Sequence, residues 1–147
     1  MRNYQLYLIE DEFADHYFGR EQMFYQLFLD FERASGDLKL IIKRQIEFIT
    51  KTIPTIRLHK IMKQQLSKRH DFHIKKDMTY YLEMNGILST AKMEVYDRSL
   101  QLHAEGSYEA ETIFFEVLRK WETSFLAVDL ENKRYGWLKP IKERKFI

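Results

Sequence analysis

Hydrophobic residues in the first half of the chain recur at the spacing of α-helices. In residues 20–33 the apolar positions predict one amphipathic helix that buries a stripe of Phe24, Leu27, Phe28 and Phe31. Residues 4–9, which precede this helix, are rich in types that favour β-strands. An acidic run follows at residues 10–12, and its charge suits the first turn of a helix. The pattern therefore predicts a strand and then helical structure, with a break or bend at Gly19.

Two further helices are predicted before the chain turns basic near residue 68. Gly36 is expected to end the preceding helix and Asp37 to cap the N-terminus of the next. After Asp37, apolar residues form an arc that continues toward Pro54. This arc consists of Leu38, Ile41, Ile42, Ile46 and Ile49. Pro54 suits the start of the next helix because the missing N–H of proline would be unpaired there anyway. The apolar positions of that helix are Ile56, Leu58, Ile61, Met62 and Leu66.

The second half of the chain is dominated by alternation of apolar and polar residues, the pattern of half-buried strands. Strands are expected at residues 78–84, 91–96, 100–104, 125–130 and 134–138, with turns at residues 85–86, 97–98 and 131–133. A helix at residues 108–121, capped by Gly106 and Ser107, interrupts them. The whole pattern predicts an α+β fold, an antiparallel-rich β-sheet with about four α-helices packed on it. At 147 residues, we expect a single domain that spans residues 1–147.

Composition narrows the class of function. The 24 lysine and arginine residues nearly balance the 22 aspartate and glutamate residues, and the net charge of +2 is far from the strongly basic footprint of a dedicated DNA-binding domain. The absence of cysteine excludes disulfides, thiol catalysis and cysteine-ligated metal sites. Residues 1–10 lack the apolar core of a secretory signal, and no apolar run is long enough to span a membrane. We therefore expect a cytoplasmic protein that binds neither membranes nor, directly, nucleic acid.

Candidate sites for metal binding and catalysis are weak. His70 and His73 have a spacing that approaches that of metal ligands, but the sequence offers no second ligand pair. Asp15 and His16 are adjacent on a helix and therefore point about 100° apart, with no nucleophile placed beside them. The acidic cluster of Asp11, Glu12 and Asp15 is explained by the helix dipole better than by Mg²⁺ binding. We expect no cofactor, no metal and no enzymatic activity.

Basic residues support an alternative function, a small nucleic-acid-binding regulator. They lie in two stretches: Lys60, Lys63, Lys68, Arg69, Lys75 and Lys76 in the first, and Lys139, Lys142, Arg144 and Lys145 near the C-terminus. Because the whole chain is nearly neutral, solvated surface explains them better than phosphate binding. The alternative predicts binding that weakens steeply with salt.

Aromatic residues make up 15% of the chain. In the N-terminal region they surround more of the helical surface than a single buried stripe requires. Phe13 and Tyr17 stand at i and i+4 and would share one helix face. On the second helix, Gln45 falls within the apolar arc and Phe48 lies at its edge. An exposed amide can orient a partner and an exposed ring can fill its pocket, although an ordinary helix boundary fits the pattern of Gln45 and Phe48 equally well.

Several strings of the sequence resemble the SirA family of sporulation inhibitors of replication. They are YLIEDEFADHYFGRE at residues 7–21, RQIEFIT at 44–50, YEAETIFFEVLRK at 108–120 and KRYGWLKPIKER at 133–144. The resemblance covers the whole chain in register, while residues 62–104 are only loosely similar and support no transfer of individual residues.

The resemblance implies a protein that is made at the onset of endospore formation and binds the N-terminal domain of the replication initiator DnaA. It implies a partner surface formed by Phe13, Tyr17, Gln45 and Phe48. The family can carry Tyr where this chain has Phe48, so packing has to replace any contact through a hydroxyl. We expect a non-enzymatic inhibitor of replication initiation that acts as a monomer and binds DnaA one-to-one.

Overall fold

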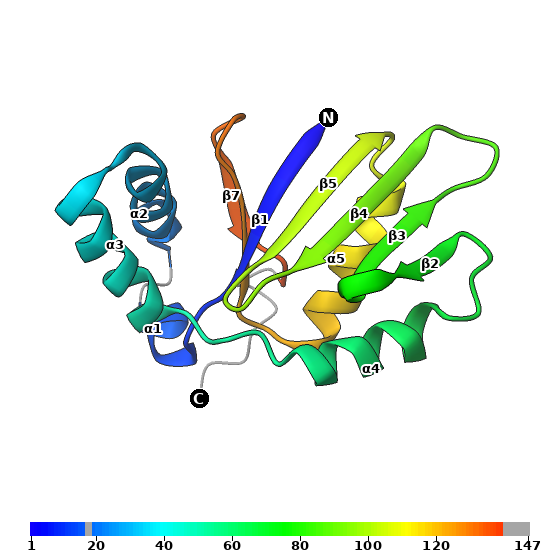
Figure 1. Ribbon diagram of the computed structural model, residues 1–147, viewed down its shortest axis with the longest axis horizontal. Coiled ribbons are helices and arrows are strands. Elements are labelled where there is room, and N and C mark those ends of the chain that lie inside the picture. The colour runs from blue at the N-terminus through cyan, green and yellow to red at the C-terminus, as the bar shows by residue number, and fades with distance from the viewer. Residues whose placement is uncertain (17–18, 140–147) are drawn as a thin grey trace.

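The computed structural model describes residues 1–16 and 19–139, and in these residues one seven-stranded sheet forms the centre of the molecule (Figure 1). The strands are β1 (Arg2–Leu8), β2 (Phe72–Lys75), β3 (Thr79–Glu83), β4 (Ser89–Val95), β5 (Leu100–Gly106), β6 (Phe125–Asp129) and β7 (Arg134–Trp137). Their order is β2-β3-β4-β5-β1-β6-β7, and every neighbouring pair is antiparallel. The predicted α+β class with an antiparallel-rich sheet is confirmed.

Five α-helices and one short 3₁₀ helix accompany the sheet in the described part of the chain. They are α1 (Asp11–His16), α2 (Glu21–Arg33), α3 (Gly36–Ile49), α4 (Thr55–Leu66), α5 (Glu109–Trp121) and the 3₁₀ helix η1 (Lys76–Met78). The predicted break at Gly19 is confirmed, because this residue lies between α1 and α2 with a φ of +79°. Among the described residues, no helix is both long enough and apolar enough to cross a membrane.

The two faces of the sheet are covered by different helices, as Figure 1 shows. Along β1, Leu6 and Leu8 point to one face and pack with the buried residues of α4 and α5. Tyr7 points to the other face and packs with α2 and α3, over strands β6 and β7. The front of β3, β4 and β5 in Figure 1 carries no helix. The helices α2 and α3 thus form a separate layer at one end of the sheet.

Some details of the helices differ from the sequence predictions. The N-cap of α3 is Ser35 and the helix begins at Gly36, so Asp37 lies in the first turn instead of capping it. The N-cap of α5 is Tyr108, and the hydroxyl oxygen of Ser89 on β4 accepts a hydrogen bond from the N–H of Ala110. A side chain from a neighbouring strand therefore takes the place of the cap predicted at residues 106–107.

The apolar arc predicted for α3 is only partly buried. Ile42 and Ile46 are buried, whereas Leu38 is 58% exposed and Ile41 is 52% exposed. The helix also ends at Ile49, since Thr50 has extended backbone angles and forms a β-bridge with Ile9. At Ile41 the exposed part of the arc lines a groove beside α2.

Candidate functional site

The described surface contains an apolar groove between α1, α2 and α3, with a volume of about 720 Å³. Its lining residues are Phe13 from α1, Met23, Phe24 and Leu27 from α2, and Ile41, Arg44, Gln45, Phe48 and Ile49 from α3. A groove of this size and character can accept apolar side chains of another molecule.

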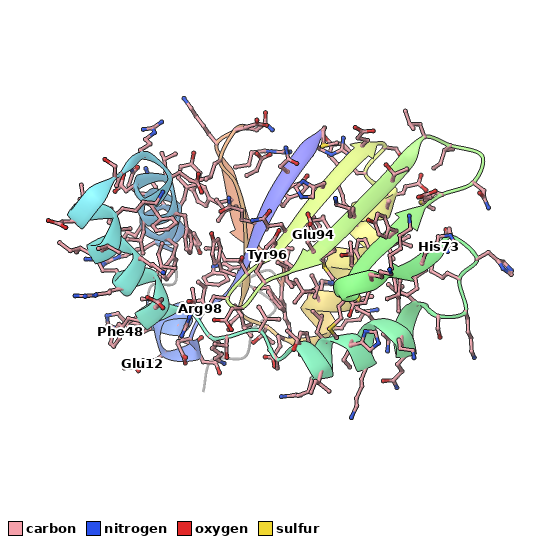
Figure 2. The ribbon with its side chains drawn as sticks, in the orientation of Figure 1. Glu12, Phe48, His73, Glu94, Tyr96 and Arg98 are labelled. Atoms are coloured by element: carbon pink, nitrogen blue, oxygen red, sulfur yellow. The ribbon has the colours of Figure 1, made fainter. Side chains whose placement is uncertain are left out.

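Phe13 and Phe48 form one end of the groove. Their ring centroids are 5.3 Å apart and the rings meet edge to face at 63°. Phe48 is 72% exposed, while Phe13 is half-buried. Figure 2 shows Phe48 pointing outward at the base of α3, near the helix α1 that carries Glu12. An exposed ring supported by a second ring suits insertion into a partner because its position is already fixed.

Backbone hydrogen bonds join the end of α3 to the end of β1. The N–H of Glu10 donates to the carbonyl of Ile49 at 2.8 Å, and the N–H of Lys51 donates to the carbonyl of Leu8 at 2.7 Å. Since α1 follows directly after β1, these bonds set the position of Phe13 relative to Phe48. The groove therefore has one end fixed to the centre of the sheet.

The C-terminus of α3 is capped by Arg98 from the turn between β4 and β5. The Nη1 group of Arg98 donates to the carbonyls of Glu47 at 3.1 Å and Thr50 at 2.8 Å. The last turn of α3 has no basic residue of its own, so Arg98 supplies the cation that complements the helix dipole there. Figure 2 shows Arg98 beside the base of α3.

The other wall of the groove, α2, is held to the sheet by aromatic packing and one polar contact. Trp137 on β7 donates from Nε1 to the Glu21 carboxylate at 3.0 Å, and its ring meets that of Phe24 at 6.0 Å. Tyr7 and Phe28 stack with centroids 3.9 Å apart. Burial raises the pKa of the Tyr7 hydroxyl above its ordinary value, so this ring stays neutral in the packed layer.

The polar groups of the groove lie on α3. Arg44 and Gln45 are both exposed and line the groove beside its apolar residues. A guanidinium can bind a carboxylate or a carbonyl of a partner, and an amide can donate and accept at the same time. The arrangement thus combines apolar anchoring with polar orientation, as protein interfaces do.

Three of the four predicted partner-binding residues lie in this groove. Phe13, Gln45 and Phe48 come together there, while Tyr17 lies outside the described residues. That these side chains bind a partner stays a prediction.

Sequence reasoning does not assign the remaining wall residues to the site. These residues are Met23, Phe24, Leu27, Ile41, Arg44 and Ile49. The excess of apolar residues around α2 is a signal that points toward Met23. Ile41 carries no such signal, because its position in the apolar arc of α3 fits the core equally well.

Other candidate sites have structural explanations. Asp11 accepts a hydrogen bond from Ser124 at 3.0 Å and pairs with Lys51 at 3.3 Å, so its carboxylate fastens α1 to its surroundings. His70 and His73 are both exposed. Across residues 1–16 and 19–139, no group of three or more His, Cys, Asp or Glu side chains is placed to hold a metal ion.

Comparison with known proteins gives two consistent findings. The family model described as sporulation inhibitor of replication protein SirA matches residues 2–142. The chain is also similar to the sporulation inhibitor of replication protein SirA of Bacillus subtilis (strain 168), with 42% identity over 148 residues. That similarity covers 99% of each chain.

Proposed function

Because this chain belongs to the SirA family of sporulation inhibitors of replication, we propose that it restrains the initiation of chromosome replication during sporulation. In this proposal it binds the N-terminal domain of the initiator DnaA, as a monomer and one-to-one, and acts by occupancy without turnover. A single domain spanning residues 1–147 serves as the binding module, in the cytoplasm where DnaA works.

The groove between α1, α2 and α3 is the observation that carries the proposal. It brings Phe13 of α1 together with Gln45 and Phe48 of α3. The whole of α2 lies between α1 and α3 in the sequence. The family resemblance implies these same residues as the partner surface. The exposed ring of Phe48 serves as an anchor in the partner, and Gln45 orients it through hydrogen bonds.

Charge around the groove suggests which surface of DnaA fits. Arg44 is exposed at the groove, and it requires an acceptor on the partner once water is excluded. The complementary surface therefore presents one or two apolar side chains next to a carboxylate or free carbonyls. Occupation of that surface would stop DnaA from using it for self-assembly at the origin or for contacts with other replication proteins.

Calorimetry with the isolated N-terminal domain of the protein's own DnaA tests the proposal. We expect saturable one-to-one binding at two salt concentrations. Phe48→Ala should weaken it about 30-fold, or about 2 kcal/mol, because a truncated hot-spot ring no longer fills its pocket. Phe13→Ala and Tyr17→Ala should have effects of similar size.

Leu88→Ala provides a matched control for Phe48→Ala. Leu88 is 73% exposed, close to the exposure of Phe48, and lies in the loop between β3 and β4, away from the groove. Its truncation should leave the affinity unchanged. Absence of binding by the parent protein would overturn the function, whereas equal losses in both variants would overturn the assignment of the groove.

The step that is blocked can be tested separately. If the inhibitor prevents self-assembly, DnaA should fail to form its complex on origin DNA when the inhibitor is bound to it. Normal assembly with the inhibitor bound would contradict this version and favour interference with other replication proteins. Phe48→Ala, which should not bind, is the control in either case.

A further inference from the structure

The outer face of α4 carries positive charge that the groove does not use. Between Glu47 and Asp71 the sequence contains no acidic residue. Lys60, Lys63 and Lys68 are exposed, and within the described residues none of them forms an ion pair. The structure therefore gathers cations on one face of a chain whose net charge is only +2.

Ordinary helix electrostatics does not account for this face. A cation in the last turn, such as Lys63, is favoured by the helix dipole. Lys60 lies in the middle of the helix, where that effect is small. Among the described α-helices, α4 is also the one without an acidic residue in its first turn.

The apolar side of α4 is already in use. Leu58, Met62 and Leu66 are buried in the core beneath the sheet. An amphipathic helix that enters a lipid surface needs a free apolar face, and α4 has buried its own. The face left to solvent carries one exposed apolar residue, Ile56, beside its lysines. A single apolar side chain is too little for insertion into a lipid surface, so the charge of this face suits a polyanion better than a membrane.

The net charge of the whole chain favours solvated surface, but the gathering on one face of lysines that form no ion pair within the described residues points the other way. We propose that this face binds the sugar–phosphate backbone of duplex DNA through Lys60, Lys63 and Lys68, without reading the base sequence. Charge complementarity to regularly spaced phosphates favours such contacts. Single strands are usually held by stacking on exposed aromatic rings. In residues 55–76 the single aromatic ring of Phe, Tyr or Trp type is Phe72, which is buried. The face therefore fits a duplex better than a single strand.

This contact would be compatible with occupation of the groove. In Figure 1, α4 lies below the strands at the lower right, whereas α2 and α3 lie at the left end of the molecule. Their hydrophobic clusters are also distinct, since α4 packs in one and α2 and α3 in the other. The protein could hold a partner in the groove and contact DNA through α4 at the same time.

Fluorescence anisotropy with a labelled duplex of arbitrary sequence, in the absence of DnaA, tests the proposal. We expect a dissociation constant of about 10⁻⁴–10⁻⁶ M that rises with salt, as for non-specific binding. For the parent, a plot of log association constant against log salt concentration should have a negative slope. In the triple variant Lys60→Gln/Lys63→Gln/Lys68→Gln the steepness of this slope should decrease by about 3, because each lost phosphate contact contributes about 0.9 to it.

The matched control is Arg33→Gln/Lys43→Gln/Lys120→Gln, which removes the same charge from three exposed positions elsewhere. It should keep the parent slope. Equal changes in both triple variants would show an effect of net charge alone and overturn the assignment to α4. No binding at low salt would overturn the proposal, as would binding to phosphatidylserine-containing vesicles without binding to the duplex. None of these outcomes depends on DnaA binding.

Discussion

Two aromatic side chains, Phe13 and Phe48, define the end of the groove and contact each other edge to face. Because the rings come from α1 and α3, the pair also joins two helices that are otherwise connected through backbone bonds near Thr50. We predict a coupling free energy of about 1 kcal/mol between them, the value typical of aromatic pairs. Urea unfolding of the parent, Phe13→Ala, Phe48→Ala and the double variant measures it. Strictly additive effects would show that the pair does not stabilise the groove.

Gly106, at the end of β5, is a second residue whose identity is set by its surroundings. Its φ of +78° is unfavourable for other residues, and a Cβ there would overlap the carbonyl oxygen of Leu88. Gly106→Ala should therefore lower the free energy of unfolding by about 3 kcal/mol or more, from backbone strain and steric overlap together. Thermal or urea unfolding provides the measurement.

Gly136 on β7 is the matched control for Gly106. It has no positive φ, and a Cβ added at this residue would meet no atom within 4 Å. Gly136→Ala should change stability by no more than about 0.5 kcal/mol, as expected for an unconstrained site. If both substitutions destabilised equally, the contact with Leu88 would not be the cause.

At the scale of elements, α3 depends on a residue far from it in sequence. Arg98 donates to the carbonyls of Glu47 and Thr50 at the end of this helix. Arg98→Ala should lower stability by about 2 kcal/mol, because hydrogen bonds from a charged donor are lost and the carbonyl of Thr50 is left partly buried without that donor. It should also weaken binding in the groove, since Phe48 lies in the last turn of α3.

Arg98→Lys separates charge from geometry in this prediction. Lysine keeps the positive charge near the helix C-terminus but lacks the planar guanidinium. We expect it to restore part of the stability lost in Arg98→Ala, measured by urea unfolding. An unchanged unfolding midpoint in Arg98→Ala would contradict the role of Arg98 as the cap of α3.

The elements found from sequence are those with a strong local period. The helices α2 and α5 and the strands β3 to β7 lie within a few residues of their predicted ranges because each alternates or repeats clearly. Strand β2 escapes prediction because it has only four residues, so the alternation of Phe72 and Ile74 with polar neighbours is too short to stand out. The placement of β1 between β5 and β6 depends on long-range pairing that no local pattern encodes.

The site is only partly predictable for a similar reason. The hydrophobic period on α3 correctly locates Ile42 and Ile46 in the core but also assigns Leu38 and Ile41 to it. A period alone does not distinguish a buried stripe from an apolar groove wall, because both place apolar residues on one face. Gln45 and Phe48, which break the pattern, are the useful signal.

At the scale of the whole molecule, the groove and the basic face of α4 belong to helices that pack in separate hydrophobic clusters against one sheet. The near-zero net charge conceals this division, since the exposed cations of α4 are balanced by acidic residues elsewhere. The sheet that joins the two regions ends at β7, which packs against α2. The stability of that edge therefore matters to the groove.

The turn between β6 and β7 should make the protein sensitive to acid. Asp129 is 1% exposed and accepts hydrogen bonds from Asn132 at 2.9 Å and from Arg134 at 2.9 Å. Burial raises the pKa of this carboxyl, but the hydrogen bonds outweigh burial, so the pKa lies below its ordinary value of 3.8. Because the pKa is lowered on folding, the carboxylate stabilises the fold fully at any pH above its pKa in the unfolded state. This contribution is lost as the pH falls through its pKa in the folded state.

We therefore predict that Asp129→Asn lowers the free energy of unfolding by about 2 kcal/mol at neutral pH, since charge-assisted hydrogen bonds are weakened. The same variant should lose less stability than the parent as pH falls from about 5 to 2, because it has no carboxylate to protonate there. Urea unfolding at a series of pH values measures both effects, and Glu131→Gln, an exposed neighbour in the same turn, controls for the lost charge. Parallel pH profiles for the parent and Asp129→Asn would show that acid acts through other carboxylates. Convergence of the two profiles in acid would instead place the sensitivity in the β6–β7 edge, against which α2 and one wall of the groove are packed.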